Sequence, residues 1–162
     1  MTVRPAVPAD VPALTAVYGH HVEHTLATFD LVRPTEADRA AWLAAHPGGR
    51  HRVLVAERDG AVVGFAASGP FRPRPAYDAT VETSVYLAPE ATGQGLGTAL
   101  YAALFEALAG EDLHRALAVI AQPNPASEAL HRAFGFAHVG TLGEVGRKFG
   151  RWVDTAWFAK DL

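Results

Sequence analysis

Hydrophobic positions along the chain follow two periods, one of two residues, typical of strands, and one of three to four, typical of helices. Val53 and Val55 alternate with polar residues ahead of Asp59-Gly60, a pair that favours a two-residue hairpin turn. Leu100, Leu104 and Leu108 recur at every fourth residue and form one apolar helix face. The pattern predicts strands at about 2–5, 51–58, 61–68, 80–87, 116–121, 137–144 and 152–160, and helices at about 11–26, 36–46, 98–109 and 125–134.

Residues at the expected helix ends support these limits. Asp10 can cap the first helix, with Pro12 in its first turn. Thr35 and Asp38 have the spacing of a capping box and start the second helix, and Gly135 ends the last one. The proline-rich segment 69–78 is predicted to be a loop. The order of elements is an α/β mixture without a regular βαβ repeat.

Length and composition narrow the class of protein. A chain of 162 residues, 49% hydrophobic, corresponds to a single domain over residues 1–162. The net charge of −3 and the lack of a basic block argue against a nucleic-acid partner. The chain has no Cys, which excludes disulfides, thiolate nucleophiles and Cys-ligated zinc. Without a signal peptide or an apolar run near the ~20 residues of a membrane helix, we expect a cytoplasmic protein that handles small molecules.

A glycine-rich segment, Gly93-Gln94-Gly95-Leu96-Gly97, lies between a predicted strand and a predicted helix. Such a loop exposes backbone N–H groups at a helix N-terminus and can hold a pyrophosphate. The loop alone is equally consistent with a tight turn that binds nothing. It is not a dinucleotide fingerprint, because Thr98 replaces the third glycine, and it lacks the Gly-Lys-Ser/Thr of a P-loop.

Three segments together resemble the acetyl-CoA core of the GNAT N-acetyltransferases. They are Val85-Tyr86-Leu87-Ala88-Pro89, the glycine-rich segment, and Asn124-Pro125-x-Ser127-x-x-Leu130-His131-x-x-Phe134-Gly135-Phe136. The resemblance covers most of the chain. It narrows towards phosphinothricin N-acetyltransferases and acetyltransferases of methionine derivatives through segments 69–78, 82–86 and 146–154.

The resemblance implies a central, strongly twisted and mostly antiparallel sheet flanked by helices. Acetyl-CoA, the co-substrate, is expected in a cleft between splayed strands that end near Leu87 and Ala121. It implies direct acetyl transfer, without a metal, to the primary amine of phosphinothricin, methionine sulfoximine, methionine sulfone or a similar analogue. It also implies a homodimer. Two alternatives stay open: a non-catalytic acyl-CoA sensor of the same fold, or an acetyltransferase for a polyamine or a peptide N-terminus.

The same resemblance implies coenzyme contacts from three places: the predicted strand that ends at residue 87, the glycine-rich loop, and the segment that begins at residue 124. Thr92 stands where the superfamily usually has Gln or Arg, which leaves one phosphate contact without its usual side chain. Asn124 and Ser127 resemble residues that contact the pantetheine arm, although Asn before Pro also ends strands and Ser127 could cap a helix. The expected coenzyme-binding residues are Val85, Tyr86, Leu87, Thr92, Gly93, Gln94, Gly95, Leu96, Gly97, Thr98, Asn124 and Ser127.

Catalytic roles fall on Glu82 and His131 through the resemblance. Glu82 would be the base that deprotonates the amine, since a partly buried carboxylate can have a raised pKa. A backbone N–H of the Val85–Leu87 segment would stabilise the oxyanion. His131 occupies the position of a superfamily Tyr and would protonate the CoA thiolate, with Tyr101 as the weaker candidate; the thiolate can also leave without an acid.

Substrate contacts are expected from Arg74 and Tyr77, with Phe29 as a wall of the same pocket. An arginine fork suits a carboxylate or a phosphinate, and Arg72 could replace Arg74; a solvated loop charge is the alternative for Arg74. His20-His21-Val22-Glu23-His24 has the spacing of a zinc peptidase motif, yet five residues match easily by chance. We interpret it as a polar helix face near the substrate mouth.

Overall fold

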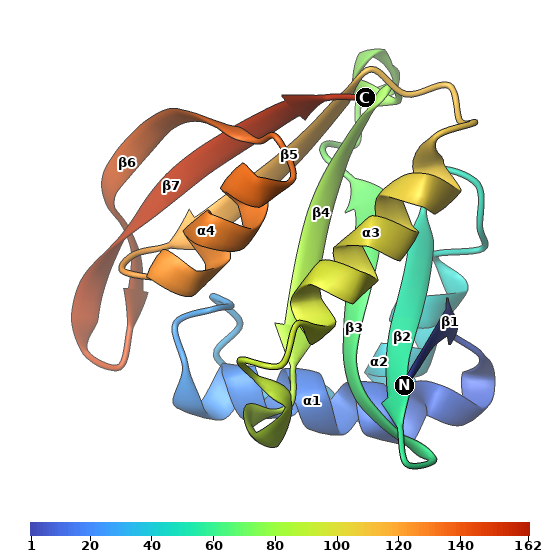
Figure 1. The fold of residues 1–162 in the computed structure, drawn as a ribbon. Helices are drawn as coiled ribbons and strands as arrows, with labels where there is room; N and C mark the ends of the chain where they lie inside the picture. The colour runs from blue at the N-terminus through green and yellow to red at the C-terminus, as the bar shows by residue number, and fades with distance from the viewer.

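The structure is a computed structural model that describes all residues 1–162. One seven-stranded sheet has the order β1-β2-β3-β4-β5-β7-β6, and every neighbouring pair is antiparallel except β4 and β5 (Figure 1). This is the mixed α/β, mostly antiparallel fold that the sequence predicts. The strands are β1 (Thr2–Pro5), β2 (Arg52–Arg58), β3 (Ala61–Pro70), β4 (Thr80–Leu87), β5 (Arg115–Ala121), β6 (Ala137–Lys148) and β7 (Arg151–Asp161).

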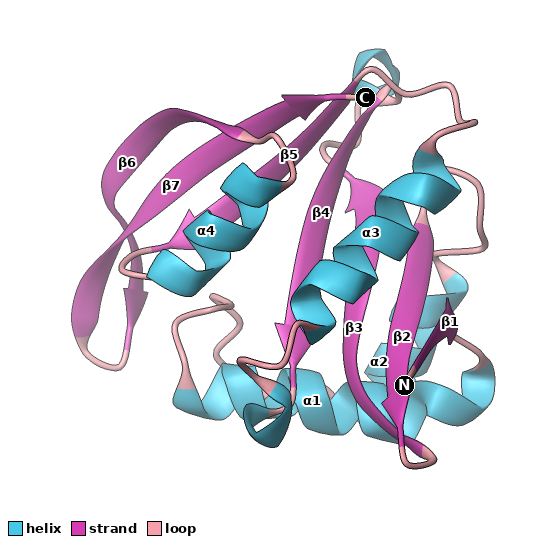
Figure 2. Ribbon diagram, in the orientation of Figure 1, coloured by secondary structure: helices cyan, strands magenta, loops and turns pink.

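Helices cover both faces of the sheet (Figure 2). They are α1 (Val11–His24), α2 (Glu36–Ala44), α3 (Leu96–Leu108) and α4 (Pro125–Ala133). α3 crosses β2, β3 and β4 on one face, and α4 lies beside β5 on the same side. α1 and α2 pack against each other and against the opposite face. The β4–β5 pair therefore has a helix on each side of it.

The main core lies between α3 and the sheet. Leu100, Leu104 and Leu108 are buried, as the four-residue spacing predicts. They belong to one cluster with Leu54 and Ala66 of the sheet. Full burial of such a side chain contributes about 1.5–3 kcal/mol. The core therefore fixes α3 over the strands that lead to its own N-terminus.

Two local predictions are confirmed in atomic detail. Thr35 Oγ1 accepts the Asp38 N–H at 3.1 Å while the Asp38 carboxylate accepts the Thr35 N–H at 2.9 Å, which completes the capping box of α2. Asp59 and Gly60 have φ of 53° and 79°, as a type I′ hairpin turn between β2 and β3 requires.

The prediction that the Asp10 side chain caps the first helix is wrong. Asp10 stands at the N-cap position of α1, but its carboxylate accepts the Val7 N–H at 2.8 Å and pairs with Arg4 at 2.8 and 2.9 Å. A short 3-10 helix, Pro8–Asp10, occupies the entry to α1 instead. The guanidinium group outcompetes the helix amides because charge-assisted, bidentate hydrogen bonds are the stronger ones.

Several element limits also differ from the sequence pattern. α1 stops at His24 because Thr25 is extended, with φ −133° and ψ 169°. α3 starts two residues earlier than predicted, at Leu96, since Gly95 already turns the chain. β6 continues to Lys148, through register shifts between His138 and Gly140 and between Leu142 and Gly146. Such bulges interrupt the two-residue period by which the strand would be recognised.

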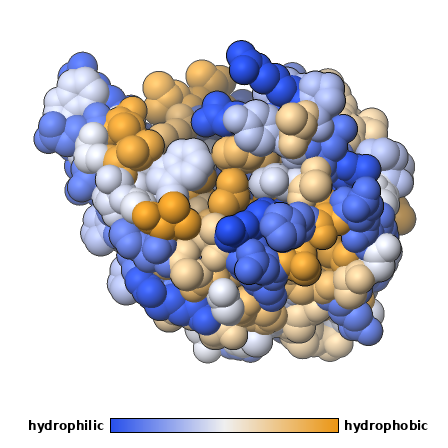
Figure 3. All heavy atoms as spheres, turned by 90° about the horizontal axis from the view of Figure 1, so that it is seen from above, coloured by the Kyte–Doolittle hydropathy of each residue, from blue (hydrophilic) through white to orange (hydrophobic).

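Hydrophobic and hydrophilic side chains are interspersed over the face seen from above, without one continuous apolar area (Figure 3). No helix combines the length and the hydropathy that crossing a lipid bilayer requires.

Candidate functional site

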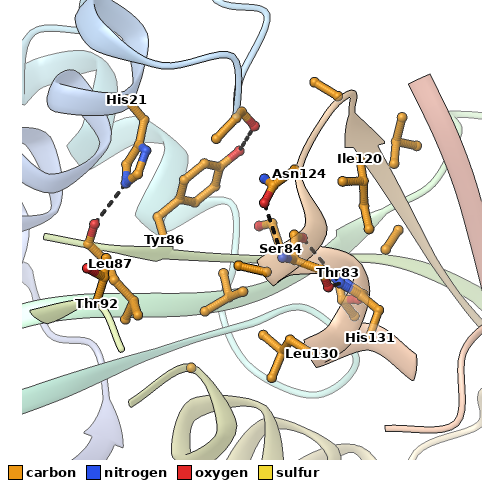
Figure 4. Close-up of a pocket in the computed structure, with 18 of the residues that line it drawn as sticks. His21, Thr83, Ser84, Tyr86, Leu87, Thr92, Ile120, Asn124, Leu130 and His131 are labelled. Atoms are coloured by element: carbon orange, nitrogen blue, oxygen red, sulfur yellow. Dashed lines mark hydrogen bonds between the residues drawn. The ribbon is translucent and has the colours of Figure 1, made fainter. Parts of the chain in front are cut away.

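The two central strands separate and leave a cleft. β4 and β5 are paired only through Thr80–Arg115, Val81–Ala116 and Glu82–Leu117, after which they diverge (Figure 1). The Ala88 N–H donates to Val63 O of β3 at 2.9 Å, so by strand alternation the backbone of Val85 and Leu87 faces the opening. A cavity of about 290 Å³ lies there, lined by both strands and by α4 (Figure 4). The predicted cleft between splayed strands is confirmed.

The glycine-rich segment closes one end of this cleft. Gly93 and Gly95 have φ of 71° and 76°, a backbone conformation that glycine adopts without strain. The first N–H groups of α3, like those of any helix, have no hydrogen-bond partner within the helix, and no side chain caps them. A Cβ added at Gly93 or Gly95 would meet no atom within 4 Å, so the loop surface is open. These features fit the cradle for an anion.

Polar side chains of the loop are occupied within the protein. Thr92 Oγ1 donates to Pro89 O at 2.9 Å, and the Gln94 amide donates to Glu90 O at 2.8 Å. Arg58, at the end of β2, donates to Gln94 Oε1. With Thr92 in place of Gln or Arg, the loop has no cation of its own, and Arg58 is the cation that contacts it.

Asn124 and Ser127 line the opposite wall of the cavity. Asn124 Oδ1 accepts the Ser127 N–H at 3.1 Å and thereby caps α4 (Figure 4). The capping role that the sequence offered for Ser127 therefore belongs to Asn124. The Ser127 hydroxyl is 3.4 Å from His131 Nδ1, so the cap places it next to the candidate acid.

Glu82 is the last residue of β4 that pairs with β5. It lines three neighbouring hollows of the surface. Partial burial raises the pKa of its carboxyl, and the positive charge of Arg72 opposes that rise. The side chain still reaches solvent. A carboxylate with these properties can accept a proton from a bound amine near neutral pH.

His131 is 3% exposed and belongs to a buried polar pair. Its Nδ1 lies 2.7 Å from the Ser127 carbonyl and must donate, so in the neutral imidazole Nε2 accepts the Tyr101 hydroxyl at 2.8 Å. Burial lowers the pKa of His131 and raises that of Tyr101. The two candidate acids thus form one hydrogen-bonded unit, in which only His131 lines the cavity.

The candidate substrate residues fall into two groups. Phe29 lines a hollow together with Glu82, as a pocket wall would. Arg74 and Tyr77 line none of the three hollows that contain Glu82. The arginine whose charge acts on Glu82 is Arg72.

Arg39 was not predicted as a site residue from the sequence, and His21 was placed only on a polar helix face near the substrate mouth. His21 Nε2 donates to Leu87 O at 2.8 Å and lines the cleft (Figure 4). The ring centroids of His20 and His24 lie 4.9 Å apart. No group of three or more His, Asp or Glu side chains is placed to hold a metal ion. Arg39 lines a hollow with Glu82. The one available signal was the spacing Arg39-x-x-Trp42, which puts both on one helix face.

Known proteins resemble the chain over its whole length. Residues 19–136 match the acetyltransferase (GNAT) family. The chain is 53% identical to a phosphinothricin N-acetyltransferase of Streptomyces coelicolor, covering 99% of this chain and 95% of that protein. It is 38% identical to an L-methionine sulfoximine/L-methionine sulfone acetyltransferase of Pseudomonas paraeruginosa, covering 99% and 94%. A phosphinothricin acetyltransferase from Sinorhizobium meliloti, crystallised with acetyl-CoA, superposes with a TM-score of 0.94 at 40% identity, covering 99% and 88%.

Proposed function

The chain belongs to the acetyltransferase (GNAT) family, and from that premise we propose that it acetylates the primary amine of a small amino acid analogue. Phosphinothricin, methionine sulfoximine and methionine sulfone, on which relatives act, define the substrate class. The observation that carries the proposal is the cleft between β4 and β5, which puts open backbone amides and a candidate base within one cavity.

For acetyl-CoA, the proposed contacts follow the geometry of the cleft. The backbone N–H groups of residues 93–98 would hold the diphosphate at the start of α3. The strand backbone at Val85 and Leu87 would pair with the pantetheine arm, and Asn124 and Ser127 would contact it from the other wall. Arg58 is close enough to the loop to add a positive charge.

Glu82 is the proposed general base. It would take a proton from the ammonium group of the acceptor, and the freed nitrogen lone pair would attack the thioester carbon. A backbone N–H of the Val85–Leu87 segment would stabilise the negative charge that develops on the acetyl oxygen. No thiol is available in this chain for an acyl-enzyme, since it has no cysteine.

His131 is the proposed donor of a proton to the departing thiolate. The donor must be the imidazolium, and burial lowers the pKa of His131, so that form is a minor species at neutral pH. Its contribution to turnover is therefore expected to be modest. On the acceptor side, Phe29 would form a wall beside Glu82, and Arg72 would face the α-carboxylate at the mouth. Arg74 and Tyr77 are proposed for the same contact from the resemblance of segment 69–78 alone.

The experiment is a thiol-release screen with acetyl-CoA against phosphinothricin, methionine sulfoximine, methionine sulfone, a polyamine and a peptide N-terminus. We expect turnover with the amino acid analogues. Glu82→Gln should bind acetyl-CoA with unchanged heat in calorimetry but lose at least about 100-fold in turnover. Binding without turnover of any amine would favour the acyl-CoA sensor, and a polyamine or peptide as the best substrate would replace the proposed acceptor.

We also propose a homodimer located in the cytoplasm. The strands β6 and β7 expose four large apolar side chains, which an interface between two copies would cover. Light scattering of the purified protein tests this, and a monomer at micromolar concentration would contradict it. Fractionation of cells tests the location. The four residues are Val139, Leu142, Val145 and Trp152.

A further inference from the structure

We propose that Arg39 binds the oxygen atoms on the side-chain head group of the acceptor, in a specificity pocket beside Glu82. The inference rests on the proposed function and adds the subsite that distinguishes an oxygenated head group from a plain thioether. It starts from a buried charged side chain that has no ion-pair partner and whose Nε has no hydrogen-bond partner.

Arg39, on α2, is buried but unpaired. Its side chain is 5% exposed, and its Nε has no hydrogen-bond partner. No carboxylate lies within ion-pair distance of its guanidinium. A buried cation without a partner costs folding free energy, so an arrangement of this kind points to a ligand that completes it.

Aromatic rings hold the guanidinium in place. Its central carbon lies 4.0 Å from the centroid of the Tyr18 ring and 4.5 Å from that of Trp42, with Phe65 at 6.0 Å. Cation–π contacts of this kind offset part of the cost of burial and restrict the orientation of the fork. They leave the Nε–H group without a hydrogen-bond partner, so it remains available to an acceptor oxygen.

The hollow in front of Arg39 borders the cleft between β4 and β5 at Glu82. It has a volume of about 440 Å³, and its wall includes Trp42, Phe65, Tyr86 and Glu82. Glu82 also lines the cleft between β4 and β5. An acceptor whose amine meets Glu82 at the cleft can therefore extend its side chain towards Arg39.

Besides Glu82, two carboxylates lie in the same wall, and each accepts hydrogen bonds from groups other than Arg39. Asp30 accepts the Tyr18 hydroxyl at 2.7 Å, and Asp38 belongs to the capping box of α2. Neither pairs with Arg39, which is the one cationic side chain in the wall of this hollow. The pocket therefore combines aromatic walls and three acidic side chains, Asp30, Asp38 and Glu82, with one cationic donor.

That combination matches the head groups of the proposed substrates. Phosphinate, sulfone and sulfoximine groups each carry oxygen or nitrogen acceptors on a tetrahedral centre that also bears a methyl group, at the end of a two-methylene stem. The fork of Arg39 would donate to the acceptors, and the methyl group and stem would pack against Trp42 and Phe65. Methionine has the same stem and methyl group but lacks the oxygens.

The test compares methionine sulfone with methionine in steady-state kinetics of the parent, Arg39→Met and Arg39→Lys. We expect Arg39→Met to lower kcat/KM about 10- to 100-fold for the sulfone and less than about 3-fold for methionine. Arg39→Lys, which keeps the charge without the fork, should lie between. Arg115→Met, which removes an exposed arginine paired with Asp161, is the matched control and should change neither substrate.

Melting curves of each variant accompany the kinetics, and Arg39→Lys decides the question if Arg39→Met does not fold. Equal losses for the two substrates would mean that Arg39 only supports the fold, and unchanged sulfone kinetics would mean that it does not contact the head group. Either result overturns the inference while the proposed function stands. A parent enzyme that acetylates no amino acid would overturn both.

Discussion

Glu82 experiences two opposing effects, and their balance sets the pH at which its carboxylate can act as a base. Burial raises its pKa, and the charge of Arg72 lowers it. Because the base must be deprotonated, kcat/KM should rise with pH through a pKa above the usual carboxyl range. The acid limb of the pH profile therefore reports the surroundings of this one side chain.

Arg72→Gln is expected to move that acid limb to higher pH, since it removes the positive charge that favours the carboxylate. Steady-state rates from pH 4 to 9 measure the shift. Arg74→Gln is the matched control, because Arg74 is not among the groups that act on the Glu82 pKa. A limb that stays in place or moves to lower pH in Arg72→Gln would contradict the assignment.

His131 gives a prediction of opposite sign. Its acid form, the imidazolium, grows as the pH falls, and burial lowers the pKa of His131, so that this growth occurs at lower pH than for an ordinary histidine. The ratio of parent kcat to that of His131→Phe should therefore increase towards pH 6 and approach one above pH 8. Tyr101→Phe keeps the imidazole and should retain the parent's pH dependence. A ratio that does not vary with pH would leave His131 with a structural role only.

Side chains of the site differ in how far the sequence could predict them. The glycine loop and Glu82 lie in motifs that are local in the chain, so they could be recognised. Arg39 could not, because its position depends on how α1 and α2 pack against each other and against β3. On an isolated amphipathic helix, an arginine is expected to face solvent. Arg39 is buried because the rings of Tyr18 and Phe65, from other elements, pack against it.

At the scale of elements, the separation of β4 from β5 depends on close contact between β3 and the end of β4. A Cβ at Gly64 would lie 2.5 Å from Leu87 Cδ2 and 2.9 Å from the Tyr86 carbonyl oxygen. Backbone cannot yield as a flexible side chain does. Gly64 thus keeps the coenzyme-facing segment of β4 against its neighbour.

Gly64→Ala is expected to lower the free energy of unfolding by about 1–3 kcal/mol and to weaken acetyl-CoA binding, because β4 must shift. Urea unfolding and calorimetry measure the two effects. Gly140→Ala in β6 is the control, since an added Cβ there meets no atom within 4 Å, and its effect should stay within about 0.5 kcal/mol. Equal stability of the two variants would contradict this account of β4.

Elements with a clear local signal were predicted well. The capping box of α2 and the Asp59-Gly60 turn involve residues next to one another in sequence, and both are confirmed. The far half of β6 could not be delimited, because bulges disturb the alternation and most of the β6 side chains are exposed on either face. β7 was predicted to within one residue at each end. Local rules describe an element reliably when its hydrogen bonds are local or its buried face is regular.

The whole molecule consists of two parts of a sheet that share only three residue pairs between β4 and β5. A ligand that fills the cleft contacts both parts and binds only when they are correctly placed. We expect CoA at about 100 times its dissociation constant to raise the free energy of unfolding by ~2.7 kcal/mol. Thermal melting with and without CoA measures it.

CoA should also slow the exchange of the backbone amide hydrogens of β4 and β5. Pantetheine, which lacks the diphosphate, is the control and should stabilise the protein less, because it cannot engage the start of α3. A melting temperature that does not respond to saturating CoA would contradict a site between the two parts.

The pairing of Glu82 with Leu117, where β4 and β5 diverge, bears on how the set of amines accepted by such an enzyme can change. Glu82, the proposed base, lies where β4 and β5 diverge, and these two strands form the walls of the proposed acetyl-CoA cleft. The pairing of the two backbones would therefore keep the base and the thioester aligned. Residues of α2 and of the 71–79 connection can then vary, and with them the amine that is accepted, while the distance over which the acetyl group travels is preserved.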